Sequence, residues 1–198
     1  MESKEIKITN RKDIILLLLY VQGKTKEICE SISGRTRLMK IIYLFEKEIY
    51  HKIGFDKHIP SEKMADFKPD KYGPFSVDVF RDLNFFINIG YIEAKRHEDE
   101  EATMADIEEF SKYLDEFIME GDDVEEELAS YEIQEFILTE EGKRFASTLY
   151  DLLTEKQKTT LINFKSRYNS APLTTLLRYV YKTYPESAKR SEIRNKIL

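Results

Sequence analysis

The chain has 198 residues, 41% of them apolar and 34% charged, which is enough for one well-buried domain with additions. Cys29 is the single cysteine, so an intrachain disulfide is excluded and a reducing compartment is favoured. The apolar run 14–21 is too short to span a bilayer, and residues 1–5 lack the cationic start of a secretory signal. We therefore expect a cytoplasmic protein without a membrane partner.

The net charge of −6 is divided between two opposed regions. Residues 98–127 contain fifteen acidic residues and one lysine, a net charge of −14. Residues 156–198 contain ten basic residues and two acidic ones, a net charge of +8. The overall charge is therefore a poor guide to what either region binds.

The chain before residue 72 reads as helices separated by loops. Dense or periodic apolar residues identify the first helix, capped by Thr9 or Asn10, and the long helix that follows it. The segments in order are a helix over 11–21, a short helical piece over 26–32, a helix over 35–48 and a polar loop over 54–70.

A third helix is predicted directly after a turn. Gly73-Pro74 is a turn signal, and the Ser76 side chain can accept a hydrogen bond from the first free amides of the helix. Helical spacing places five apolar residues inward: Val79, Phe80, Leu83, Phe86 and Ile87. The outward residues are then Asp78, Arg81, Asp82, Phe85, Asn84 and Asn88. Gly90 can adopt the left-handed conformation that ends a helix.

Two strands and three helices are predicted after Gly90. A strand over 91–95 has its natural partner in 131–138, and the acidic block between them has helical periodicity. The helices that follow are 139–153, 154–168 and, after a break at 169–172, 173–184. We expect the Lys/Arg-rich tail after Pro185 to be freer to bind than the body of the helix before it.

Two groups of residues resemble known families. The run from Gly34 to Leu44, followed by Tyr72-Gly73-Pro74-Phe75-Ser76, resembles the Panacea, or SocA-like antitoxin, domain, in which a K-[LI]-[LI]-Y helix precedes a YGP turn. Residues 136–144 are similar to the LTEEG strand-to-helix junction of winged-helix regulators. The resemblance spans residues 11–150 and implies a small non-enzymatic protein that binds a partner protein or, in some members, DNA.

The predicted fold is mainly α with a small β-wing. A winged-helix-like, Panacea-type core occupies 1–153, with a helical acidic insertion in the wing at 98–130. A basic helical C-terminal extension occupies 154–198. The helix over 139–153 can serve a homodimer.

The residues offer little for catalysis. His51, His58 and His97 have no second His or Cys at a metal-ligand spacing, and Cys29 has no surrounding motif of an activated nucleophile. Gly34-Arg35-Thr36 lacks the spacing and the lysine of a phosphate-binding loop. We therefore expect no enzyme activity, no metal and no cofactor.

Two binding hypotheses remain. In the first, the acidic helix binds a protein such as a toxin, a defence factor or a nucleic-acid-binding protein, through Phe110, Tyr113, Phe117, Asp122, Asp123, Glu125, Glu126 and Glu127. In the alternative, a winged-helix transcription regulator binds DNA through Lys71, Arg81, Asn84, Lys95, Arg96, Lys189, Arg190 and Arg194. Asp78 and Asp82, if outward, would oppose phosphates. The acidic block could also fold back on the basic tail.

Overall fold

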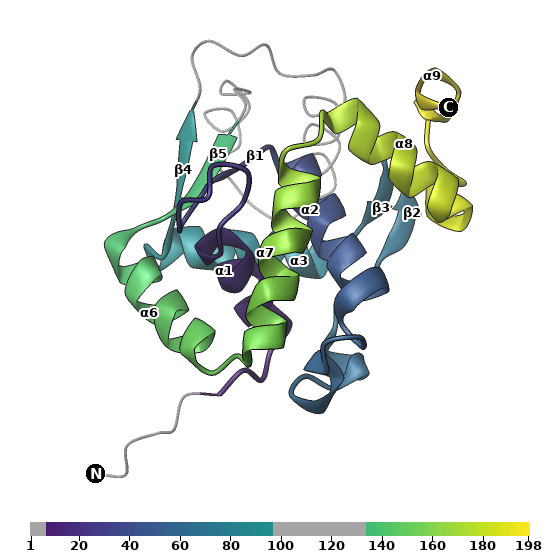
Figure 1. Cartoon of the computed structure of the whole chain (residues 1–198). Helices are drawn as coiled ribbons and strands as arrows, with labels where there is room; N and C mark the ends of the chain where they lie inside the picture. Colours follow the sequence, from purple (N-terminus) through teal and green to yellow (C-terminus); the bar gives the residue numbers. More distant parts are fainter. Residues whose placement is uncertain (1–6, 97–133) are drawn as a thin grey trace.

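The computed structural model describes residues 7–96 and 134–198 (Figure 1). This part is mainly helical with a small antiparallel sheet. Its helices are α1 (Arg11–Tyr20), α2 (Arg35–Leu44), α3 (Val77–Asn88), α6 (Glu140–Asp151), α7 (Glu155–Asn169), α8 (Leu173–Thr183) and α9 (Arg194–Ile197). Its strands are β1 (Ile32–Ser33), β2 (Lys68–Asp70), β3 (Gly73–Phe75), β4 (Ile92–Arg96) and β5 (Gln134–Leu138). The predicted acidic helix and its eight partner-binding residues lie outside the described residues.

A three-stranded sheet of order β1-β5-β4 lies at one end of the molecule (Figure 1). The predicted pairing of the strands around residues 92 and 138 is confirmed, because Ile92 lies opposite Leu138 in antiparallel register. The prediction of a short helical piece over 26–32 is wrong. Lys26 and Cys29 have φ angles of 62° and 61°, which an α-helix does not accommodate, and Ile32 instead pairs with Phe136 at the sheet edge.

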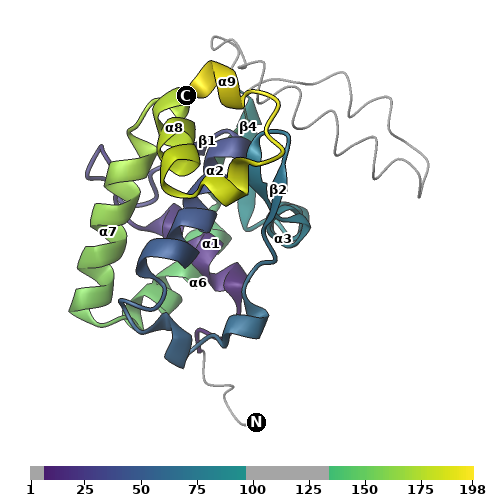
Figure 2. The ribbon, with the colours of Figure 1, turned by 90° about the vertical axis from the view of Figure 1, so that its right-hand side faces the viewer.

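Helix α1 runs through the centre of the molecule (Figures 1 and 2). Residues 14–19 are all buried, as expected for a helix that is apolar on every side. It packs against α3, α6 and β5, while α2 packs against α7, α8 and β3. Buried residues of α7 and α8 belong to the same hydrophobic core as those of α1 and α2. Within the described residues, no helix combines the length and the apolar character needed to cross a membrane.

Side-chain caps begin three of the helices. Asn10 caps α1 in a reciprocal capping box with Asp13, and Thr139 caps α6. Thr154 caps α7. Ser76 does precede α3, but the cap expected of its side chain is absent, and its Oγ is buried without a hydrogen-bond partner in the described chain.

The C-terminal tail is docked on the rest of the described chain. The Glu192 amide donates a hydrogen bond to the Lys71 carbonyl between β2 and β3 (2.8 Å). Arg178 Nε on α8 donates to the Ile197 carbonyl (2.8 Å), and Ala188 is fully buried. The tail therefore covers the β2–β3 turn and one end of α8.

Candidate functional site

The residues that carry the family-like pattern are buried. The Nζ of Lys40, on α2, donates a hydrogen bond to the carbonyl of Pro74 (3.1 Å), and the Lys40 side chain is fully buried. Gly73 has a φ of 93°, and a Cβ placed on it would lie 2.6 Å from the Tyr181 ring of α8. Tyr72 is also buried. We call Lys40, Tyr72, Gly73 and Pro74 the buried motif; it joins α2, β3 and α8, and all four residues are buried.

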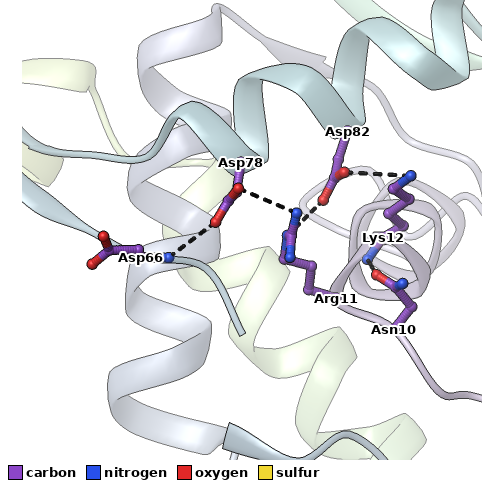
Figure 3. A network of polar contacts seen from close by, with 6 residues as sticks. All are labelled: Asn10, Arg11, Lys12, Asp66, Asp78 and Asp82. Atoms are coloured by element: carbon purple, nitrogen blue, oxygen red, sulfur yellow. Dashed lines mark hydrogen bonds and ion pairs between the residues drawn. The ribbon is translucent and has the colours of Figure 1, made fainter. Parts of the chain in front are cut away.

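One side of α3 faces the start of α1 (Figure 3). Arg11 Nε lies 2.8 Å from Asp82 Oδ2, and Lys12 Nζ lies 3.6 Å from Asp82 Oδ1. Arg11 also pairs with Asp78 (3.4 Å), and the Asp66 amide donates a hydrogen bond to Asp78 (3.4 Å). Burial raises the pKa of Asp82, while Arg11 and Lys12 oppose that rise.

The prediction that Asp82 points outward is therefore wrong, since only 3% of this residue is exposed. Asp78 and Asp82 are four residues apart, so both reach the same neighbouring helix. Two basic side chains at the start of α1 compensate the two carboxylates. The same contacts occupy Arg11 and Lys12, which would otherwise be available to nucleic acid.

The outer side of α3 is apolar. Val77, Phe85 and Ile89 are 37%, 43% and 46% exposed, and the exposed Arg81 lies between the first two. Successive members are four residues apart and so form one row along the helix. We call these four residues the α3 stripe. Its three apolar members are half of the six large apolar side chains that are exposed in the described part of the chain.

The remaining nucleic-acid candidates are spread over several elements. On α3, the Asn84 Oδ1 accepts a hydrogen bond from Arg35 (3.0 Å), so its amide is already engaged. Lys71 pairs with Glu192 (3.2 Å), and Lys189 pairs with Glu186. The others are distributed as follows: Lys95 is exposed on β4, Arg96 is the last residue of β4, Arg190 is exposed in the tail, and Arg194 is half-buried on α9.

Histidine, cysteine and carboxylate side chains are the candidates for metal binding or nucleophilic chemistry. Across 7–96 and 134–198, no group of three or more His, Cys, Asp or Glu side chains is arranged to hold a metal ion. His51 lies 3.5 Å from Asp56 at the surface, and His97 is outside the described residues. Burial raises the pKa of the Cys29 thiol, so the reactive thiolate is disfavoured.

Lys165 is a second buried lysine, and the sequence pattern did not identify it. Its Nζ donates hydrogen bonds to the carbonyls of Val21 (2.8 Å), Leu19 (3.4 Å) and Glu30. Burial lowers its pKa to about 8. Because these carbonyls lie at and beyond the end of α1, the amine closes that end of the helix and has a structural role.

Comparison with known proteins identifies no relative from which a function could be inferred. No protein-family model matches this sequence, and no curated protein matches it. The candidate site is the α3 stripe, of which residue spacing identified Arg81 and Phe85 but not Val77 and Ile89. A search for apolar residues repeated every four positions on the polar side of α3 would have identified them.

Proposed function

We propose that the protein is a non-catalytic, antitoxin-like regulator that binds another protein through the α3 stripe. The observation that carries this proposal is the row of exposed residues Val77, Phe85 and Ile89, in which Arg81 lies between the first two. Contiguous exposed apolar side chains commonly mark interaction sites. Aromatic and arginine side chains are also the residues enriched where protein interfaces derive their affinity.

The proposed scaffold is winged-helix-like. Its support is the chain order α1, β1, α2, α3, β4, β5, with the β2–β3 pair inserted between α2 and α3, together with the sheet order β1-β5-β4. In this connectivity, three helices precede a hairpin, and a short strand after the first helix joins the hairpin strands. The Panacea-like pattern at Lys40 and at Tyr72-Gly73-Pro74 is compatible with this scaffold, because it fixes α2 to the turn that opens α3.

The proposed partner is a basic protein, such as a toxin or a defence factor. The segment between β4 and β5 includes the block with a net charge of −14. Such an excess of carboxylates attracts a basic partner and accelerates its association. Phe110, Tyr113 and Phe117 within the same segment are proposed to add apolar contacts, and its acidic residues are proposed to set the preference for a basic surface.

The test compares two exposed apolar residues. Purified products of neighbouring genes are titrated calorimetrically with the wild type, Phe85→Ser and Leu152→Ser; Leu152, the C-cap residue of α6, is 49% exposed and serves as the matched control. We expect Phe85→Ser to weaken partner binding at least about tenfold, which corresponds to about 1.4 kcal/mol, and Leu152→Ser to leave it unchanged. Equal affinities for all three proteins would contradict the proposal.

The alternative is a DNA-binding transcription regulator, which the same connectivity and the exposed Arg81 favour. The contacts of Asn84 and Asp82 oppose it, because one candidate base-reading side chain is engaged and two basic side chains are already paired. A mobility-shift assay with the upstream DNA at two salt concentrations separates the two functions. Binding that falls steeply with salt and is lost in Arg81→Ala would favour the alternative.

A further inference from the structure

A pocket of about 370 Å³ lies between three segments of the described chain and Pro74 of β3. One wall is the π turn Phe45–Ile49, into which α2 widens, and a second is the segment 65–69 that leads into β2. The short helical turn Pro185–Ala188 of the docked tail forms the third. The volume is in the range of small-ligand sites, and π turns of this kind often occur at functional sites.

Three carboxylates line the pocket, and one of them lacks a compensating charge in direct contact. Asp66 pairs with Lys68 (3.3 Å), and Glu186 pairs with Lys189. Glu46 forms no ion pair within the described residues, and its Oε2 is buried without a hydrogen-bond donor from that part of the chain. It lies half-buried, and burial raises its pKa even though the Ala65 amide and the charge of Lys47 oppose the rise.

Two aromatic residues line the same pocket as Glu46. The rings of Tyr43 and Phe67 both line the pocket, with centroids 5.1 Å apart and planes at 72°. Lys47 Nζ already lies 5.6 Å from the centre of the Tyr43 ring, which shows that a cation is accommodated near this ring. A half-buried carboxylate next to aromatic rings is a suitable environment for a cationic side chain.

We propose that this pocket binds the guanidinium group of an arginine side chain presented by the partner protein. Guanidinium is planar, stacks on aromatic rings and binds carboxylates through two parallel hydrogen bonds, and its weak hydration favours half-buried sites. The inference rests on the proposed function only in assigning the arginine to the basic partner. Asp66 lines the pocket, and its amide donates a hydrogen bond to Asp78 on α3 (Figure 3). Asp78 directly follows Val77, the first residue of the α3 stripe.

The binding test uses blocked amino acids and NMR amide shifts. The labelled protein is titrated with N-acetyl-arginine methylamide, the corresponding citrulline compound, which is a neutral isostere, and the lysine compound. We expect only the arginine compound to shift the amides of Glu46 and residues 65–69, and Glu46→Gln to weaken its binding at least about tenfold. Glu62→Gln, which changes an exposed carboxylate outside the pocket lining, should bind like the wild type.

Several outcomes would overturn the inference. Equal shifts with citrulline would show that charge is irrelevant, and equal shifts with lysine would show no selection of guanidinium. Unchanged binding of the arginine compound in Glu46→Gln would show that the Glu46 carboxylate does not bind the guanidinium group. A second variant, Phe67→Leu, should also weaken arginine binding, so a folding defect in one variant does not decide the test.

The pocket and the proposed function can fail separately. If Phe85→Ser weakens partner binding while Glu46→Gln does not, the pocket inference is wrong and the proposed function stands. If the arginine compound binds through Glu46 while Phe85→Ser has no effect on partner binding, the proposed binding role of the α3 stripe is wrong and the pocket inference stands.

Discussion

The buried motif and the α3 stripe are neighbours in sequence but differ in their exposure to solvent and in their contacts with the rest of the fold. Lys40, Gly73 and Pro74 are held in the interior by a hydrogen bond and by contact with α8. Val77 and Phe85 follow in the next helix, three and eleven residues after Pro74, and are exposed to solvent. The family-like pattern therefore reports how the scaffold is built, whereas the α3 stripe proposed to bind a partner lies outside that pattern.

This difference has a practical consequence for assigning function. Substituting the buried motif should reduce stability, and any loss of binding would follow from unfolding. Substituting the α3 stripe should reduce binding while the fold remains. The predictions below test that separation, beginning with the largest expected effect on stability.

Gly73→Ala should be the most damaging single change. The added Cβ would lie 2.6 Å from the buried Tyr181 ring, and the φ of 93° is unfavourable for alanine. We expect a loss of about 4 kcal/mol in the free energy of unfolding, measured by urea denaturation. Gly90→Ala is the matched control, because its φ is 74° and nothing lies within 4 Å of the added Cβ. It should cost about 1 kcal/mol, and equal losses would show that contact with Tyr181 is unimportant.

Lys165 should make stability depend on pH. Its pKa is about 8 in the folded protein and 10.5 for an unperturbed lysine, so between these values the unfolded chain holds a proton that the folded chain has released. The free energy of unfolding therefore rises with pH across that interval, and the total contribution of Lys165 to this rise is about 3 kcal/mol. Denaturation of the wild type and Lys165→Met at pH 8, 9 and 10 isolates the effect. Parallel pH profiles for the two proteins would refute it.

Lys40→Met tests the hydrogen bond inside the buried motif. The change removes the donor to the Pro74 carbonyl, and we expect a loss of about 2 kcal/mol because that acceptor remains buried. Lys47→Met, at an exposed position in the π turn, is the control and should change stability by less than about 0.5 kcal/mol. A Lys40→Met protein more stable than the wild type would mean that burying the charge costs more than the hydrogen bond contributes.

Local features were predictable from the sequence. Apolar periodicity and caps such as Thr139 and Thr154 located the main helices, and alternation paired the strands around Ile92 and Leu138. These signals depend on residues within a turn or two of each other, so they can be read without knowing the tertiary structure.

The features that were missed depend on contacts between distant segments. Strand β1 exists only because Ile32 pairs with Phe136, and Asp82 is buried only because α1 brings Arg11 against it. The docked tail likewise depends on the Lys71 carbonyl. The α3 stripe was partly predicted, and the pocket at Glu46 was not, because its walls come from three separate segments. The acidic insertion stays a prediction.

The smallest expected effect on stability is at the candidate site, in Phe85→Ala. Phe85 lies 43% exposed, with Lys12 Nζ 4.2 Å from its ring centre, so its loss should cost about 0.5 kcal/mol. Leu83, two residues earlier on the same helix, is 3% exposed, and Leu83→Ala should cost about 3 kcal/mol in the same urea denaturation. If the two losses are similar, Phe85 supports the fold and the α3 stripe is part of the scaffold. If they differ as expected, the fold tolerates an exposed phenylalanine that it does not need, and selection for a partner is the simplest physical reason to retain it.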